Sequence, residues 1–245
     1  SASLLGRLRV NIVTSNGVGE GRRGMLLKAE KDESIERFIS IVSTMENINV
    51  TKFRMPKLRD RLAVRHGHYI PKDADEKNTF RFVRSELGIL VDFMAELFKK
   101  DGNKLIGIRG MPRVGKTESV VAASVCANKR WIFLSSTMIK QTVRSSLIGD
   151  EFNGNNIFIL DGAVTRRSND ERHQQLVREM MRMDTVKVVE HPDIFVQHSE
   201  YKIEDFDYII ELRNDPDEEI TYELIEKSNM MSSVNDFGGF GGFNF

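Results

Sequence analysis

The N-terminal part of the chain combines short apolar runs with stretches of helical spacing. The pattern predicts helices at 1–8 and 33–45 and strands at 9–14, 23–29 and 47–54. Asn16-Gly17 and Gly19 to Gly21 are turn-forming, so the first two strands are expected to form a hairpin over 9–29. Helix, strand, strand, helix and strand make up most of a ferredoxin-like α+β domain over residues 1–56.

A different pattern follows. Residues 57–79 carry dense basic side chains and then an acidic-polar stretch, which predicts a linker. Apolar residues over 80–100 fall on one stripe and predict a single long helix. Apolar runs then alternate with helical segments, which favours a mostly parallel sheet. Strands are predicted at 105–108, 130–134, 157–161, 186–189, 194–197 and 206–212, and helices after residue 115 and at 138–147, 169–183 and 218–227. Residues 228–245 are rich in Gly and Phe and predict a disordered tail.

The strand at 105–108 leads into a complete G-x-x-x-x-G-K-[ST] phosphate loop, the Walker A motif. Its residues are Gly110, Met111, Pro112, Arg113, Val114, Gly115, Lys116 and Thr117. Glycines let the backbone wrap around phosphates, and the following helix presents its positive N-terminal end. Lys116 is long enough to reach β/γ-phosphates, and the Thr117 hydroxyl is suited to ligate Mg²⁺. These eight residues and Glu118 form the expected nucleotide site of an α/β P-loop domain over 80–227.

A second nucleotide-site pattern is the apolar run that ends in Asp161, about 45 residues beyond the loop. The carboxyl ends of parallel strands face the ligand, so Asp161 is expected to hold Mg²⁺ through water. Gly162 stands where many ATPases carry an acidic residue, which disfavours a motor-type hydrolase. Arg166 and Arg167 are candidates to stabilise a transferring phosphate, with a salt-bridged surface pair as the alternative.

The composition of the chain bears on whether it binds nucleic acid or membrane. Lys and Arg number 36 and Asp and Glu also 36, so net charge gives no argument for nucleic acid or membrane. No apolar stretch reaches membrane-spanning length, and we expect a soluble cytoplasmic protein. The basic segment is the one candidate for nucleic acid, although a solvated linker is favoured. Its residues are Lys57, Arg59, Arg61, Arg65, His66 and His68.

Two segments resemble known domains. The phrase L-L-G-R-L-x-V-N-I, the Gly-rich hairpin and the helix resemble an ACT-type regulatory domain whose first strand would precede Ser1. That resemblance implies a small-molecule effector near Asn11 and Asn16-Gly17, or a pairing scaffold without ligand, and a homodimer. The ending F-D-Y-I-I-E-L, turn and helix is similar to nucleotide and dephospho-coenzyme-A kinases, which implies that Arg213 and Asn214 lie near the base.

Over most of its length the chain resembles the YmfK-like proteins of Bacillus and related Firmicutes. The matching phrases are N-I-V-T-S-N-G-V (11–18), P-K-L-R-D-R-L-A-V-R-H-G (56–67) and G-I-R-G-M-P-R-V-G-K-T-E-S (107–119). The resemblance names a family and implies no reaction. Three hypotheses follow: a Mg-dependent nucleotide-binding P-loop protein, phosphotransferase-like, with ATP favoured over GTP; a low-turnover nucleotide-dependent regulator; and a nucleic-acid-associated NTPase.

Overall fold

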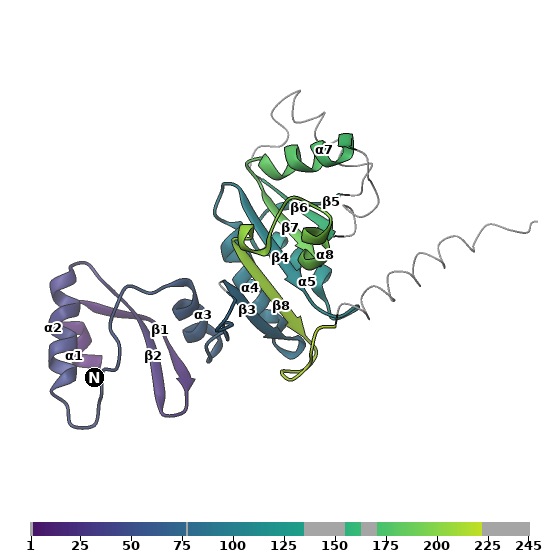
Figure 1. The fold of residues 1–245 in the computed structure, drawn as a ribbon. Coiled ribbons are helices and arrows are strands. Elements are labelled where there is room, and N and C mark those ends of the chain that lie inside the picture. Colours follow the sequence, from purple (N-terminus) through teal and green to yellow (C-terminus); the bar gives the residue numbers. More distant parts are fainter. Residues whose placement is uncertain (1, 77, 135–154, 163–170, 222–245) are drawn as a thin grey trace, which may run out of the picture. The chain divides into compact units, whose positions relative to one another are not determined.

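The structure, a computed structural model, describes residues 2–76, 78–134, 155–162 and 171–221. The chain forms two compact units, Ser1–Ile70 and Pro71–Phe245 (Figure 1). The first contains a two-stranded antiparallel sheet and the second a six-stranded parallel sheet. The chain is therefore an α+β protein, and the parallel sheet belongs to the second unit.

The first unit is a hairpin with three helices. Its elements are α1 (Ala2–Arg7), β1 (Val10–Gly19), β2 (Arg22–Ala29), α2 (Asp32–Ser43) and α3 (Leu58–His66). The predicted hairpin and the helix expected over 33–45 are confirmed. Asn16-Gly17, expected to be turn-forming, lies instead inside β1, and the turn is at Glu20-Gly21. Asp32 and Glu33 lie in the first turn of α2, where negative charge stabilises the helix dipole, and Phe38 is buried.

Two other expectations for this unit are wrong. Residues 47–54 form no strand: Asn47 and Asn49 have low strand propensity, and Ile48 and Phe53 are exposed.

The segment expected to be a linker instead contains helix α3. Its Leu62, Ala63 and Val64 are buried, and a Cβ at Gly24 of β2 would lie 2.7 Å from Val64 Cγ2. The buried Asp60 carboxylate accepts hydrogen bonds from Arg54 (2.7 Å), Tyr69 (3.1 Å) and the Lys57 N–H (2.9 Å). A dense run of charges therefore concealed a helix whose apolar face packs on the hairpin.

The second unit is built on six parallel strands in the order β3-β8-β4-β7-β6-β5. The strands are β3 (Thr79–Val83), β4 (Lys104–Arg109), β5 (Arg130–Leu134), β6 (Asn156–Asp161), β7 (Val186–Glu190) and β8 (Tyr208–Arg213). The helices are η1 (Arg84–Glu86), α4 (Leu87–Phe98), α5 (Lys116–Cys126), α7 (Glu171–Arg182), α8 (Pro192–Gln197) and η3 (Ile203–Asp205). Helices α4 and α5 pack together on one face, and α7 and α8 cover the other (Figure 1).

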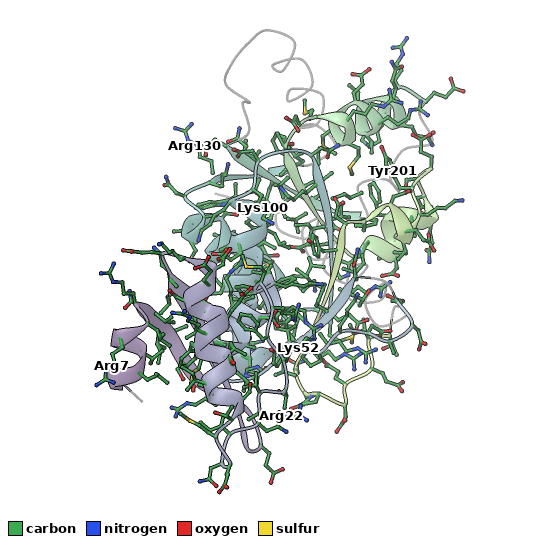
Figure 2. The ribbon with its side chains drawn as sticks, turned by 90° about the vertical axis from the view of Figure 1, so that its left-hand side faces the viewer. Arg7, Arg22, Lys52, Lys100, Arg130 and Tyr201 are labelled. Carbon is green, nitrogen blue, oxygen red and sulfur yellow. The ribbon has the colours of Figure 1, made fainter. Side chains whose placement is uncertain are left out.

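Side chains alternate between the two faces of each strand and fill both layers of the core. One cluster joins the sheet to α7 and α8: Leu105, Leu134, Phe158, Leu160, Val177, Met180, Met181, Val189, Phe195, Phe206 and Ile209. Phe93 of α4 packs on Phe80 and Phe82 of β3, with ring centroids 5.0 and 5.5 Å apart. Charged side chains such as Lys100 and Arg130 are exposed (Figure 2).

Three of the predicted elements in this unit differ from the structure. The single helix expected over 80–100 is strand β3 followed by α4, because Phe80 and Phe82 also satisfy the two-residue period of a strand. The strand expected over 194–197 is helix α8, which begins with Pro192 at a position where proline favours a helix start. Residues 218–221 are not helical, and the rest of the helix expected over 218–227 lies outside the described residues. The helix at 138–147 and the tail 228–245 also lie outside them.

The second residue of β7 is a buried lysine. Lys187 is 0% exposed, and its ammonium donates to Asn103 Oδ1 (2.7 Å) and to the Met183 carbonyl. Burial lowers the pKa of Lys187 to about 8, although Asp184 and Asp207 oppose the shift. This cation lies at the amino ends of the strands, opposite the edge that carries the phosphate-loop motif.

Within the described residues, no helix has both the length and the apolar character that a membrane crossing needs.

Candidate phosphate-binding site

The phosphate-loop motif joins β4 to α5, as the sequence predicts. A Cβ at Gly110 would lie 2.5 Å from the Leu212 carbonyl oxygen of β8, so only glycine fits this close backbone approach. Gly115 has φ 107°, in the left-handed region that favours glycine, and its carbonyl accepts the Ser119 hydroxyl at 2.7 Å. The backbone packing at Gly110 and the backbone conformation at Gly115 therefore explain why both motif positions are glycine.

Lys116 begins α5 and turns its side chain back over the loop. It is 6% exposed, and Nζ donates to the Gly110 and Met111 carbonyl oxygens, both at 2.9 Å. Burial lowers the pKa of Lys116, and the carboxylates of Glu190, Asp161 and Glu118 act against that shift. A buried ammonium is thus held inside the loop beside the first N–H groups of a helix, which is an arrangement suited to an anion.

Thr117 contacts a carboxylate that our sequence analysis missed. Its hydroxyl donates to Glu190 Oε1 at 2.5 Å, and Glu190 is the last residue of β7. Burial raises the pKa of Glu190, while the Thr117 hydrogen bond and Lys116 act in the opposite direction. The available signal was a strand that ends in an acidic residue, the same signal that identified Asp161.

Asp161 ends β6 and is exposed. It is the register partner of Glu190, and β7 lies between β6 and β4. The residue after it, Gly162, has no room for a side chain: a Cβ would lie 2.3 Å from the His191 carbonyl oxygen and 3.0 Å from that of Glu190. The missing acidic residue at 162 is therefore explained by backbone packing against the end of β7.

His191 is a second residue that the sequence analysis did not single out. It is 7% exposed with φ 58° and ψ 59°, and its N–H donates to the Ile108 carbonyl at 3.1 Å. Its Nδ1 has no hydrogen-bond partner among the described residues. Burial lowers the pKa of His191 to about 4, and the positive charge of Lys116 adds to the shift. The imidazole is therefore neutral near pH 7.

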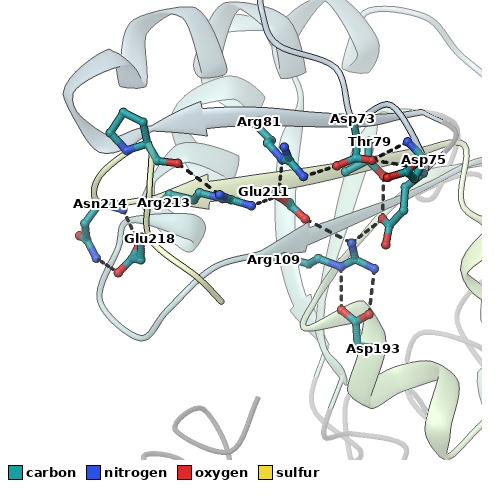
Figure 3. Close-up of polar contacts among 12 residues, drawn as sticks. Asp73, Asp75, Thr79, Arg81, Arg109, Asp193, Glu211, Arg213, Asn214 and Glu218 are labelled. Carbon is teal, nitrogen blue, oxygen red and sulfur yellow. Dashed lines mark hydrogen bonds and ion pairs between the residues drawn. The ribbon is translucent and has the colours of Figure 1, made fainter. Parts of the chain in front are cut away.

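The residue before the loop anchors a network of charges (Figure 3). Arg109 is 6% exposed and forms a two-pronged ion pair with Asp193 of α8, at 2.8 Å for each contact. It also contacts Glu76 (2.6 Å) and Glu211 (3.4 Å). Glu211 in turn accepts from Arg81 of β3 at 3.1 Å. The loop is thereby tied to β8, through Glu211 to β3, and to the start of α8.

Arg213 and Asn214, expected near a nucleotide base, engage their own turn. Arg213 donates to Glu211 (2.8 Å) and to the Pro216 carbonyl (3.2 Å). The Asn214 backbone and amide nitrogens donate to the Glu218 carboxylate at 2.6 and 2.7 Å. The structure thus brings together the motif residues 110–118, with Asp161 one strand further away. Arg166 and Arg167 lie outside the described residues.

Positions singled out in the first unit have structural contacts of their own. Asn16 and Gly17 of β1 pair with Gly24 and Arg23 of β2, and Asn11 is exposed. In the basic segment, Arg59 and Arg61 donate to the carbonyls of Ile70 and Pro56, at 2.5 and 3.4 Å. Part of the basic set is therefore used within the fold of this unit.

A cavity of about 360 Å³ lies away from the phosphate loop, between α7 and the segment that follows α8. Residues that line it include His173, Arg178, His198 and Tyr201. None of the predicted site residues contributes to its wall, so we place the candidate site by the loop geometry and not by cavity volume.

Comparison with known proteins finds one family model and one relative that match most of the chain or all of it. The family model described as "Protein of unknown function (DUF3388)" matches residues 50–240. The protein described as "Uncharacterized protein YmfK" from Bacillus subtilis (strain 168) is 66% identical over 244 residues. That match covers 100% of this chain and 89% of the relative. The chain therefore belongs to the DUF3388 family of YmfK-like proteins.

Proposed function

We propose that residues 110–118 bind the phosphates of a Mg²⁺-associated purine nucleotide, with ATP as the first candidate and GTP as the second. The observation that carries the proposal is the buried Lys116 ammonium, held by the Gly110 and Met111 carbonyls at the start of α5. Such a cation needs an anion or strong dipoles to offset its lost hydration. A phosphate fits because loop N–H groups and the helix dipole converge on the same place.

The residues around the loop also fit a hard divalent cation. The Thr117 hydroxyl and the carboxylates of Glu190 and Asp161 are oxygen donors at the carboxyl edge of the sheet. Mg²⁺ in nucleotide sites takes one or two carboxylates together with phosphate oxygens and water. When bound, the cation would neutralise charge that develops on the transferring phosphate.

Two activities are compatible with this site. The first is phosphotransfer, in which Lys116 positions the phosphates and an acceptor binds elsewhere on the carboxyl edge. The second is a low-turnover regulator, favoured by Gly162, whose packing excludes a water-activating acid directly after Asp161. The nucleic-acid hypothesis ranks below both, because Arg59 and Arg61 of the basic segment bond to carbonyls within the first unit.

The proposal also includes a role for the first unit, which would act as a sensor of a small molecule. Its hairpin is built from only two strands, and several apolar side chains, including Val13 (62% exposed) and Met25 (46%), remain at its surface. An ACT-like role would place a small-molecule effector near Asn11 and Asn16-Gly17 and would pair two copies of the chain. Sedimentation at micromolar concentration tests the pairing, and a monomer would end it.

Calorimetric titration of ATP and GTP with Mg²⁺ tests the nucleotide site, with phosphate release followed in parallel. We expect wild type to bind and Lys116→Ala to lose about tenfold to 100-fold in affinity, because charge-assisted contacts to phosphate are lost. Lys100→Ala, which removes an exposed lysine, is the matched control and should bind like wild type. Binding without phosphate release supports the regulator or a kinase that lacks its acceptor, whereas release supports an NTPase. Failure of wild type to bind either nucleotide would overturn the proposal.

A further inference from the structure

We propose that the divalent cation accompanying the nucleotide is held between Thr117 and Glu190, so that β7 supplies the main carboxylate of the cation site. Asp161, the carboxylate expected from the sequence, then acts from one strand further away. The inference rests on the nucleotide binding proposed above and assigns the cation to particular residues.

Strand order is the first argument. Strand β7 is the direct neighbour of β4, and Glu190 is the register partner of Ile108, two residues before Gly110. Strand β6 follows β7, so Asp161 is one strand further away. Neighbouring strands lie roughly 4.8 Å apart, which places the backbone of Asp161 about 10 Å from β4 and that of Glu190 about half as far. Register partners direct their side chains to the same face, so Glu190 lies in line between Asp161 and the loop.

The contact with Thr117 is the second argument. The hydroxyl donates its one hydrogen to Glu190 Oε1 at 2.5 Å, which leaves the oxygen lone pairs available to a cation. The carboxylate keeps its second oxygen for the cation or for a water bound to it. One hydrogen bond therefore orients two oxygen ligands from different elements, the start of α5 and the end of β7.

Packing at the end of β7 is the third argument. Gly162 lies against the carbonyls of Glu190 and His191, and this contact fixes the turn that carries Glu190. His191 is 7% exposed, and its Nδ1 is without a hydrogen-bond partner in the described parts of the chain. Arg109, the residue before the loop, holds Asp193 at the start of α8, directly after this turn, with two contacts of 2.8 Å. The segment at 190–193 is thus fixed from both sides, beside a buried group with unused hydrogen-bonding capacity.

The small number of protein ligands at this place suits a magnesium ion that is bound together with a nucleotide. It does not suit a cation that is held by protein side chains alone. Among the described residues, no group of three or more His, Cys, Asp or Glu side chains is arranged to hold a metal ion. Mg²⁺ keeps several waters and relies on phosphate oxygens, so one hydroxyl and one close carboxylate are sufficient. The cation should therefore bind together with the nucleotide and weakly without it.

The test compares ATP affinity in excess Mg²⁺ with ATP affinity in EDTA, by calorimetry, for wild type, Glu190→Gln and Asp161→Asn. We expect Glu190→Gln to reduce the gain in affinity from Mg²⁺ by about tenfold or more. Its affinity in EDTA should be unchanged or higher, because a negative charge beside the phosphates is removed. Asp161→Asn should reduce the gain about twofold. Thermal unfolding of each variant checks its fold, and Glu190→Asp, which keeps the carboxylate, should recover part of the gain.

Binding of Mn²⁺ in the presence of ATP, followed by electron paramagnetic resonance, gives a second measurement. Loss of nucleotide-dependent Mn²⁺ binding in Glu190→Gln, with Asp161→Asn close to wild type, would support the assignment. The reverse order, or full cation dependence in Glu190→Gln, would overturn it while nucleotide binding stood. Absence of ATP binding by wild type in both Mg²⁺ and EDTA would instead overturn the proposed function, and this inference with it.

Discussion

Two lysines at opposite ends of the strands of the same sheet have similar burial and similar pKa shifts but different roles. Lys116 at the carboxyl edge and Lys187 at the amino edge are 6% and 0% exposed. Both donate to main-chain carbonyls, and burial lowers the pKa of each. Their surroundings differ. Lys116 lies in a glycine-bounded loop at a helix start, near Glu190, Asp161 and Glu118, whereas Lys187 is bonded to Asn103 inside the fold.

The comparison shows that burial and a lowered pKa do not by themselves identify a lysine as part of a binding site. At Lys187 the ammonium bonds to Asn103 and to the Met183 carbonyl of the turn before β7, and the residue is 0% exposed. At Lys116 the same kind of cation lies beside helix N–H groups and oxygen donors that have capacity to bind a ligand. Surroundings with such unused capacity distinguish the candidate site from a structural lysine.

The largest effect that separates the two lysines should come from Lys187→Ala. It leaves a cavity and removes the hydrogen bond to Asn103, so we expect the free energy of unfolding to fall by about 3 kcal/mol. Denaturant unfolding measures this loss, and calorimetry on the folded protein should show ATP affinity within about twofold of wild type. A variant that kept its stability but lost ATP binding would reverse the roles assigned to the two lysines.

A smaller effect is expected from Gly162→Ala at the carboxyl edge. The new Cβ would meet the carbonyl oxygens of His191 and Glu190 and the Phe195 nitrogen. These are backbone atoms, which cannot move aside as the end of a flexible side chain can. We expect a loss of about 2 kcal/mol in the free energy of unfolding. Gly88→Ala is the matched control: its Cβ would meet nothing within 4 Å, and alanine on the exposed face of α4 should stabilise by about 0.5–1 kcal/mol. Equal effects of the two changes would show that the end of β7 is not tightly packed.

The smallest effect is a pH dependence that belongs to Lys187. Its pKa is lowered from 10.5 to about 8 in the folded chain, so between these values the unfolded chain binds more protons. Stability should therefore rise with pH across that window, by roughly 1 kcal/mol between about pH 7.5 and 9. Denaturant unfolding of wild type and Lys187→Met isolates this contribution, because the other titrating groups are common to both. Parallel curves for the two proteins would show that Lys187 has an ordinary pKa.

The sequence predicted the strand, the loop and the helix around the G-x-x-x-x-G-K-[ST] motif correctly, because every constraint on these elements is local. A strand, two glycines at fixed spacing and a following helix are all contiguous, and the structure has β4, Gly110, Gly115 and α5 in those places. Strand β5, at the edge of the sheet, was identified by its strand-forming residues Trp131, Ile132 and Phe133, although Trp131 and Phe133 are exposed. The apolar run of β6 was also clear, since a strand covered on both faces needs apolar residues throughout. Asp161 was located at the end of β6 for the same reason.

Glu190 was missed because its importance depends on strand order, which a local pattern does not contain. It follows Val186, Lys187, Val188 and Val189, and the buried lysine makes the run look half exposed. Only the placement of β7 between β4 and β6 brings this carboxylate to Thr117. In the same way, β3 was mistaken for part of a helix because its partner, β8, lies about 130 residues further along the chain, as the Arg81–Glu211 pair shows.

The neighbours of β4 set the order in which a nascent chain can assemble this molecule. The first unit pairs β1 with β2 and packs α3 on them, so all its contacts arise within 70 residues. In the part of the chain that the structure describes, the strands beside β4 are β7 and β8. They leave the ribosome roughly 100 residues after β4, about 5–20 s at ordinary rates of synthesis. During that interval the apolar segment that carries the phosphate loop has no strand beside it. A chain that stops before Tyr208 would leave β3 without its sheet partner and Gly110 without the backbone against which it packs.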